Sequence, residues 1–185
     1  MALQVAAGLT VPPAGKIWTV PLHGQDATEW CWLACAQMVA EMAAAGVGLQ
    51  QCVLAEKYAA GATNCCSSSP PPDNCNDGGS QTTIEQLYTD NNLGFQPTPV
   101  AGQPAEGDLV TMLLKGPVQA FWSTPDQAHV ALVVGFQSLP DGSSLYVIND
   151  PWPVGSGQIR MVTYDELVPT IPSSYDWSWD YSWHF

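Results

Sequence analysis

Basic residues are scarce in this sequence, which has four lysines and arginines against seventeen aspartates and glutamates. The formal net charge is therefore -13 at pH 7. Proteins that bind nucleic acids or anionic membrane surfaces neutralise phosphates with clusters of lysine and arginine. The composition argues against both kinds of partner, favours solubility and is compatible with cationic substrates.

Long apolar runs are also missing from the chain. No run of about 18 apolar residues, the length that a membrane-spanning helix needs, occurs in the sequence. The N-terminal stretch MALQVAAGLTVPPAGK has neither a basic leader nor a proper apolar centre, so it does not read as an intact signal peptide. The sequence therefore predicts no segment that crosses a membrane.

The remaining composition is typical of a globular protein. Hydrophobic residues make up 46% of the 185 residues, and eight Trp, six Tyr and four Phe are among them. A chain of this length buries a sizeable core without the help of a metal or an oligomer. We therefore expect a single domain and a monomer.

Six cysteines are many for a protein of this size in a reducing compartment. Four of them, Cys52, Cys65, Cys66 and Cys75, fall in or near a stretch rich in Ser, Pro, Asn and Gly, which has little core of its own. Zinc is the alternative, but C-x-x-C pairs and nearby histidines are missing. We expect two disulfides of undetermined pairing, no metal or cofactor, and a secreted or translocated protein in an oxidising environment.

The first part of the chain, up to Lys115, is expected to be mainly helical. After an extended arm over 1–20, hydrophobic spacing of three and four residues and turn signals predict four helices. The first begins near Asp26 or Thr28, and the other three cover 49–60, 82–92 and 106–114. Asp26 with Glu29, and Thr82 with Glu85, have the form of capping boxes at the first and third helix.

After Gly116 the pattern indicates strands. Four short segments are rich in β-branched and aromatic residues, namely PVQAFWS, AHVALVVGFQ, SLYVIND and GQIRMVTY. Asp141-Gly142 predicts a hairpin turn between the second and the third. The tail YDWSWDYSWHF alternates strictly, so it predicts a further strand with all its aromatic residues on one buried face. The fold class is therefore α+β, with a helical half followed by an antiparallel sheet.

A reactive cysteine is one function that the first helix would support. A thiol is a useful nucleophile as the thiolate, which helix N-termini and neighbouring imidazolium groups stabilise. Cys31 lies in about the first turn, where free backbone N–H groups favour negative charge. Cys35 lies a turn deeper and is expected to pack in the core or to pair with a loop cysteine. A purely structural Cys31 is the alternative.

His129 is the histidine best placed to serve that thiol. His23 lies in the arm, and His184 lies on the polar face of the tail, whereas His129 opens an apolar strand. The Asp141-Gly142 hairpin brings the start of this strand beside the end of the next, so His129 is expected near Asn149 or Asp150. Consecutive strand residues face opposite sides, so only one of the two orients the imidazole.

Gln25 completes the set of candidate site residues. It lies six residues before Cys31, on the approach to the helix. Its side-chain amide is a donor that would stabilise an oxyanion forming beside the sulfur. The order of a glutamine, a cysteine at a helix start, a histidine opening a strand and a following Asn-Asp-Pro would suit nucleophilic acyl transfer.

Together these motifs resemble the papain-like cysteine peptidases. WCWLACAQMV is similar to the W-C-W-A-A-x-x-Q-M pattern of a compact bacterial branch, which includes AvrRpt2-type secreted effectors and C39-like peptidases. The NCC…CN stretch before the third helix is also similar to that branch, and the resemblance covers roughly 20–162. Leu33 stands where small residues are usual, and the segment after Arg160 has no counterpart.

The resemblance implies a papain-like fold over 1–185, with a helical half over 21–115, a sheet half over 116–185 and a cleft between them. Position by position it implies Cys31 as nucleophile, His129 as general base, Asp150 as the orienting residue and Gln25 as oxyanion donor. In the branch resembled here, the aspartate before the proline holds the third position, which favours Asp150 over Asn149.

The function that follows is a cysteine endopeptidase acting on protein or peptide substrates. The same constellation would also serve a deamidase, an isopeptidase or a transpeptidase, because fold and triad do not choose the acceptor. A catalytically silent binding module with a papain-like shell is the alternative from another class. The intact chemistry at all four positions argues against it.

Overall fold

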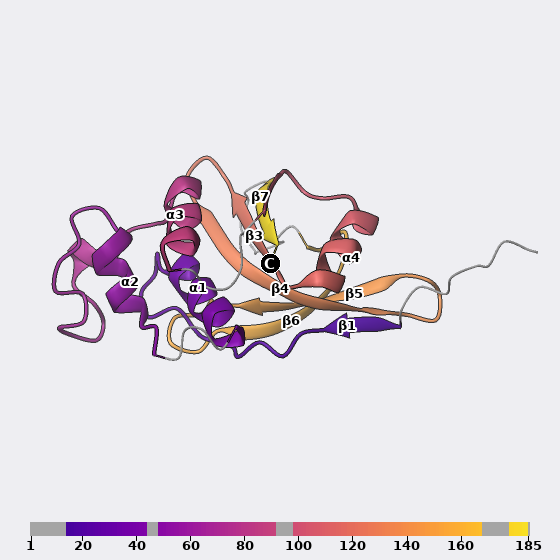
Figure 1. The fold of residues 1–185 in the computed structure, drawn as a ribbon, viewed down its shortest axis with the longest axis horizontal. Helices are drawn as coiled ribbons and strands as arrows, with labels where there is room; N and C mark the ends of the chain where they lie inside the picture. Colours follow the sequence, from indigo (N-terminus) through magenta and orange to yellow (C-terminus); the bar gives the residue numbers. More distant parts are fainter. Residues whose placement is uncertain (1–13, 44–47, 92–97, 168–177, 185) are drawn as a thin grey trace, which may run out of the picture.

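The computed structural model describes residues 14–43, 48–91, 98–167 and 178–184. The first three α-helices gather at one end, a long, twisted antiparallel sheet extends away from them, and the fourth α-helix lies against that sheet (Figure 1). The α+β class predicted from the sequence is therefore confirmed. In chain order the elements are β1 (Gly15–Ile17), α1 (Cys31–Met42), α2 (Gln51–Tyr58), a 3₁₀ helix (Asp73–Cys75), α3 (Gln81–Asn91), β2 (Thr98–Ala101), α4 (Glu106–Lys115), β3 (Val118–Ser123), β4 (Ala128–Ser138), β5 (Ser144–Asp150), β6 (Gln158–Thr163) and β7 (Ser178–His184).

The sheet has the strand order β2-β7-β3-β4-β5-β6, and β1 pairs with the far end of β4. β4 and β5 are joined by the expected turn, in which Gly142 takes a positive φ of 89° that favours glycine. Their pairing runs from Ser138 opposite Ser144 to Leu132 opposite Asn149. The beginning of β4 and the end of β5 therefore lie together at the helical end of the sheet.

Two apolar clusters fill the two faces of the sheet. One joins α1, α2 and α3 to Val130, Leu132 and Val134 of β4. The other joins α4 to Ala131 and Val133 of the same strand. Because successive strand residues point to opposite faces, β4 is buried between α1 on one side and α4 on the other. Burial on both faces explains why the β4 sequence is almost continuously apolar.

The first helix begins later than the sequence predicts. α1 starts at Cys31, Trp30 is its N-cap residue, and no side chain caps it. The capping box of Asp26 and Glu29 is therefore wrong. The backbone N–H of Glu29 instead donates to Asn76 Oδ1 at 2.9 Å. Asn76, which lies in a loop far along the chain, therefore accepts the hydrogen bond that a local N-cap side chain would otherwise accept.

The capping box predicted for the third helix is wrong as well. α3 begins at Gln81, and Ser80 Oγ accepts a hydrogen bond from the backbone N–H of Thr83 at 3.2 Å. Glu85 instead accepts from the Gln81 side chain and from Trp183 Nε1. Ser80 is one of the strongly preferred N-cap residues, so the helix starts earlier by using it.

The aromatic tail forms the predicted strand, but the single aromatic face is wrong within the described part. Trp179 packs in the cluster under α4, whereas Trp183 packs in the cluster under α1. The register of β7 on β3 shifts at Asp180, which stands between the residues paired with Trp122 and Phe121. Such a bulge reverses the facing of every residue beyond it. Tyr175, Trp177 and Phe185 lie outside the described residues.

The four loop cysteines form the two expected disulfides, Cys52–Cys66 and Cys65–Cys75. Cys65 and Cys75 are fully buried, whereas Cys66 is exposed. Within the described ranges, no group of three or more His, Cys, Asp or Glu residues is arranged to hold a metal ion. The same described residues contain no helix that is long and apolar enough to span a membrane.

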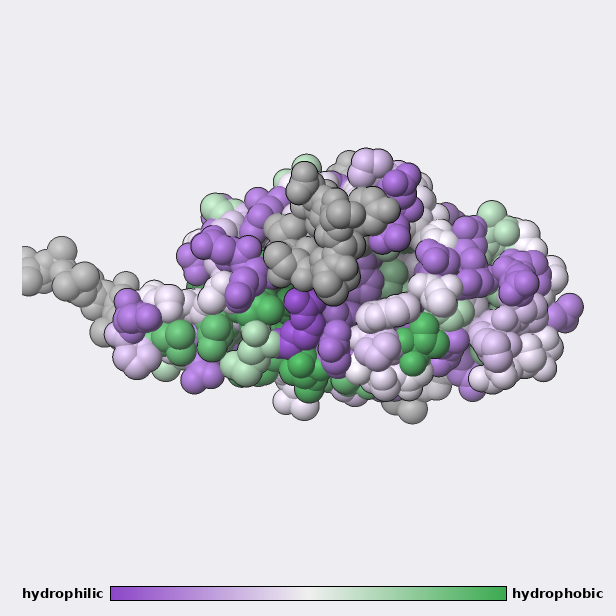
Figure 2. Space-filling view, turned by 180° about the vertical axis from the view of Figure 1, so that it is seen from behind, coloured by the Kyte–Doolittle hydropathy of each residue, from purple (hydrophilic) through white to green (hydrophobic). Residues whose placement is uncertain are grey.

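Exposed apolar side chains lie on two outer strands of the sheet, β1 beside β4 and β6 beside β5. Ile17 of β1 and Ile159 and Met161 of β6 are each more than half exposed. Both strands run along the lower part of the molecule (Figure 1), and hydrophobic residues gather along the lower part of the described surface seen from behind (Figure 2). The upper part of that view is mainly hydrophilic where it is coloured.

Candidate active site

Cys31 is the first residue of α1, and its side chain lies at the edge of the core with 7% of the residue exposed. The first N–H groups of a helix have no partner inside the helix. Among the described residues, no acceptor is found for the Cys31 backbone N–H. The sulfur therefore lies where unpaired N–H groups and the helix dipole favour a negative charge.

His129 and Asp150 are brought together by the β4–β5 hairpin. His129 Nε2 lies 2.8 Å from Asp150 Oδ1, and both side chains are largely buried. Asn149 points to the other face, where its Nδ2 donates to the Val20 carbonyl at 3.1 Å. The contact that the sequence predicts for one of the two neighbours is thus made by Asp150.

The imidazole of His129 also faces Cys31. Burial by itself lowers the pKa of His129, but hydrogen bonds to Asp150 and Cys31, together with their negative charges, raise that pKa to about 10. Asp150 occupies Nε2, so Nδ1 is the nitrogen left for the sulfur. A protonated imidazole between two anionic partners is the arrangement that stabilises a thiolate at neutral pH.

Asp150 is held by more groups than the sequence indicates. Trp152 donates its backbone N–H to Oδ1 at 3.0 Å, and Gln158 and Arg160 of β6 each approach Oδ2 at 3.5 Å. Burial raises the pKa of Asp150, but its hydrogen bond and ion pair with His129, the Trp152 N–H and the Arg160 charge outweigh burial and lower it. The alternation of β6, which puts Gln158 and Arg160 on one face, was the signal available for finding them.

Cys35 differs from Cys31 in every respect that matters for reactivity. It is fully buried, and its Sγ donates to the Val130 carbonyl at 3.6 Å. Burial, and then the negative charges of Cys31 and Asp150, raise the pKa of Cys35 well above its ordinary value. It is a free thiol packed in the core, the first of the two outcomes expected from the sequence.

Gln25 lies buried on the approach to α1, but its amide is engaged. Nε2 donates to the carbonyls of Ala27 at 2.7 Å and Thr28 at 2.6 Å. Oε1 is buried and has no hydrogen-bond partner among the described residues. The amide therefore braces the turn before Cys31, and an oxyanion would have to replace one of these two carbonyls as its acceptor.

The other two histidines lie apart from this group. His23 Nε2 forms a hydrogen bond with Glu41 Oε2 at 2.8 Å. His184 belongs to β7, and its side chain lies outside what the structure describes. Trp122 of β3, which the sequence did not single out, stacks on the His129 ring with the two planes 16° apart. The indole fixes the plane of the imidazole from the sheet side.

A cleft of about 950 Å³ opens beside the His129–Asp150 pair. Its walls come from both halves of the molecule. On one side the cleft is lined by Thr28 and Glu29, which precede α1. On the other side it is lined by the turn from Ser123 to Ala128, which joins β3 to β4, by Trp152 just after β5, and by Gln158 and Arg160 of β6. A chain segment lying in this cleft would pass over the imidazole, beside the helix start that carries Cys31.

Comparison with solved structures identifies the class of fold. The chain is similar to a C39-like peptidase from Bacillus anthracis, with a TM-score of 0.59, 12% identity, and 92% of this chain and 97% of the other covered. It is also similar to the bromelain protease from Ananas comosus, solved with an inhibitor, with a TM-score of 0.54, 11% identity and the same coverage. The fold is therefore papain-like. No curated protein sequence matches the chain.

The sequence profile of one family matches residues 15–168, and that family is described as the papain-like cysteine protease AvrRpt2. This chain belongs to that family. It is a papain-like cysteine protease, and its substrates are proteins or peptides. The resemblance inferred from the sequence is confirmed.

Proposed function

We propose that this protein is a secreted cysteine endopeptidase with Cys31 as nucleophile, His129 as general base and acid, and Asp150 as the orienting carboxylate. The observation that carries the proposal is the 2.8 Å contact between His129 Nε2 and Asp150 Oδ1, made with the same imidazole facing a thiol at the start of a helix. Each of the three groups has the environment that its role requires.

The reaction begins from a thiolate–imidazolium pair. The Cys31 sulfur attacks the carbonyl carbon of the scissile peptide bond, and the imidazolium of His129 gives its proton to the leaving amine. Water then attacks the thioester, His129 accepts a proton from that water, and the acid product leaves. Asp150 holds the ring in place and stabilises its positive charge throughout, without itself taking the proton.

Two donors serve the oxyanion that forms at each attack. The backbone N–H of Cys31 is the first, because it lies at the helix start without another acceptor among the described residues. The Gln25 amide is the second, and it exchanges one of its two carbonyl partners for the oxyanion. A charged acceptor makes the stronger hydrogen bond, which favours that exchange.

The setting of the enzyme follows from its surface and its cysteines. Two disulfides suit an oxidising compartment, and the strongly acidic composition argues against nucleic acid and anionic membranes as partners. We expect a monomer that needs no cofactor. We expect an internal segment of a substrate chain to lie in the cleft between the two halves.

Digestion of a proteome-derived peptide library in water enriched in ¹⁸O tests this function. Hydrolysis yields new C-termini that carry the label, transpeptidation yields joined peptides without it, and deamidation changes mass without breaking a chain. Wild-type enzyme should give labelled C-termini and Cys31→Ala none. A wild-type protein that cleaves nothing, with Cys31 readily alkylated, would support a transferase or deamidase instead.

A further inference from the structure

The segment between Gln25 and Cys31 forms one wall of the cleft but has little regular structure of its own. Its backbone makes one turn, in which the Trp30 N–H donates to the Ala27 carbonyl at 3.2 Å. Thr28 and Glu29 of this segment line the cleft. Neither sheet pairing nor helix bonding fixes the position of these two residues, so other contacts have to do so.

The disulfide loop supplies those contacts through Asn76. Asn76 Oδ1 accepts the Glu29 backbone N–H at 2.9 Å, and Asn76 Nδ2 donates to Thr28 Oγ1 at 2.7 Å. One side chain thus binds both cleft-lining residues. The Thr28 carbonyl in turn accepts from Gln25 Nε2 at 2.6 Å, so Asn76 is connected to the oxyanion donor through a single residue.

The residues on either side of Asn76 bind the two tryptophans that flank Cys31. The Cys75 carbonyl accepts from Trp30 Nε1 at 2.7 Å, in a fully buried contact, and the Asp77 carbonyl accepts from Trp32 Nε1 at 3.3 Å. Gly79 packs so closely on the Trp32 indole that a Cβ at this position would lie 2.5 Å from the ring. The loop therefore contacts the start of α1 on both sides of Cys31.

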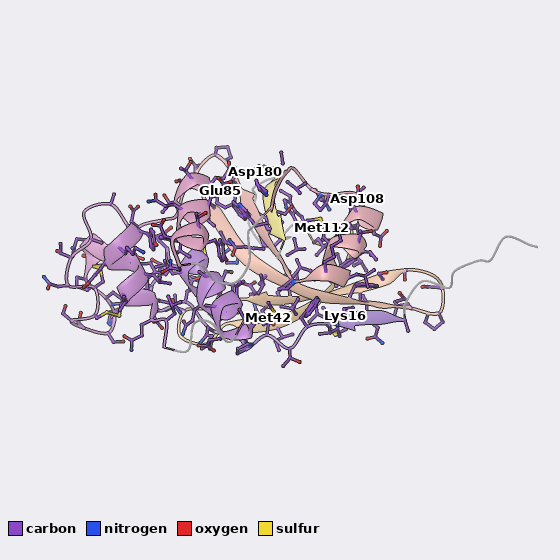
Figure 3. All side chains as sticks on the ribbon, viewed as in Figure 1. Lys16, Met42, Glu85, Asp108, Met112 and Asp180 are labelled. Carbon is purple, nitrogen blue, oxygen red and sulfur yellow. A yellow bond between two sulfur atoms is a disulfide. The ribbon has the colours of Figure 1, made fainter. Side chains whose placement is uncertain are left out.

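The buried disulfide fixes this part of the loop. Cys75 directly precedes Asn76 and is bonded to Cys65, whose backbone N–H donates to Glu56 Oε1 of α2 at 2.6 Å. The other bridge, Cys52–Cys66, joins α2 to the outer part of the loop, and no hydrogen bond among the described residues links it to the Thr28–Trp32 segment. Both disulfides lie at the helical end of the molecule, away from Asp108 and Met112 of α4 (Figure 3).

We infer that Asn76 is a positioning residue of the protease, which holds the cleft wall of Thr28 and Glu29 and, through Thr28, the oxyanion donor Gln25. The Cys65–Cys75 disulfide keeps Asn76 in place. This inference rests on the proposed function and adds to it a dependence on the loop. It separates two parts of catalysis, because the loop orients substrate and oxyanion but does not contact the His129–Asp150 pair.

Kinetics on Asn76→Ala test the inference, with a quenched-fluorescent peptide built on a sequence that the wild-type enzyme cleaves. Small misplacements of substrate relative to catalytic groups cost roughly 10- to 100-fold, so kcat/KM should fall by about that factor. The rate at which iodoacetamide modifies Cys31 should stay within about twofold of wild type. A variant that was merely less well folded would lose both together.

Matched variants sharpen the comparison. Asn74→Ala removes the same side chain on the other side of Cys75, where it bonds only to Thr63 within the loop, and should keep wild-type kcat/KM. Asn76→Asp should recover most of the activity, because a carboxylate accepts from both the Glu29 N–H and the Thr28 hydroxyl. Adding Thr28→Val to Asn76→Ala should cost little more, since the hydrogen bond that Thr28→Val removes is already lost in Asn76→Ala.

Three results would overturn the inference. Asn76→Ala with wild-type kcat/KM would show that the wall needs no such support. Equal losses of hydrolysis and of Cys31 alkylation would place the effect on the nucleophile or on folding. Wild-type enzyme without Cys31-dependent hydrolysis would remove the proposed function itself, and it is recognised separately because the Cys31→Ala control then matches wild type.

Discussion

The two flanks of the cleft are built in different ways. His129 and Asp150 are carried on adjacent strands, and their separation is set by a hairpin and its register. Cys31 is carried on a helix whose approach is irregular and is held by side-chain hydrogen bonds to a disulfide-bonded loop. The base side therefore rests on backbone pairing, whereas the nucleophile side rests on a few side chains and a covalent bond that reductants can break.

The largest difference should appear between the two cysteines of α1. Cys31→Ala should abolish peptide hydrolysis and leave the circular dichroism spectrum unchanged, because it removes only the attacking atom. Cys35→Ala should keep activity and lose about 1 to 2 kcal/mol in the free energy of unfolding, since it leaves a small cavity in the core. Hydrolysis by a folded Cys31→Ala protein would show that the nucleophile is elsewhere.

On the base side, Asp150 and its neighbour Asn149 should differ by orders of magnitude. Asp150→Ala should lower kcat by about 10² to 10⁴, because the imidazole loses its orientation and its counter-charge. Asp150→Asn should lose less, since an amide oxygen still accepts from the ring. Asn149→Ala should keep turnover and lose about 1 to 3 kcal/mol of stability by leaving the Val20 carbonyl without its donor. The opposite ranking in steady-state kinetics would exchange the two roles.

The pH profile should report the charge on the base side. In the proposed mechanism His129 acts from its protonated form, and its pKa is raised to about 10, so kcat/KM should hold through neutral pH and fall as the pH rises past about 10. In Asp150→Asn one of the two negative charges that raise the pKa of His129 is gone, so the alkaline limb should move to lower pH. A wild-type limb near the ordinary histidine value, or one that the substitution does not move, would contradict the ion-paired arrangement.

The smallest effects should separate the two disulfides. Each bridge typically contributes about 2 to 4 kcal/mol, so reducing both should lower the melting temperature by roughly 10 to 30 °C. Replacing Cys65 and Cys75 by serine should also lower kcat/KM, whereas the same replacement of Cys52 and Cys66 should change stability alone. Calorimetry and kinetics on the two double variants measure this, and equal activity in both would remove the special role of the buried bridge.

The same contrast explains how much could be predicted from the sequence. Strand alternation and the Asp-Gly turn are local signals, so β4, β5 and the approach of His129 to Asn149 or Asp150 followed directly, whereas the choice of Asp150 came from the family resemblance. The capping box at Asp26 was wrong because a distant side chain, Asn76, accepts the Glu29 N–H, and the box at Thr82 was wrong because Ser80 accepts the Thr83 N–H and the helix begins before Thr82. The bulge at Asp180 could not be predicted, because the strict alternation of aromatic and polar residues gives no sign of an extra residue in the strand.

Contacts between distant segments had no local signal at all. Arg160 reaches Asp150 across the β5–β6 pairing, and Asn76 reaches Thr28 across 48 positions of sequence. The cysteine pattern predicted two bridges but not which sulfurs pair, because several pairings close loops of similar length. The proximity of the candidate residues was therefore predictable from local patterns, while the contacts that hold the start of α1 were not.

The most direct test is the rate at which iodoacetamide modifies each free cysteine at neutral pH. Peptide mapping without reduction measures this rate for each cysteine. Cys31 should be modified orders of magnitude faster than the buried Cys35, and His129→Ala should slow its modification by removing the imidazolium that stabilises the thiolate. Modification of Cys35 as fast as Cys31, or a Cys31 rate that is indifferent to His129, would contradict a thiolate–imidazolium pair at this site.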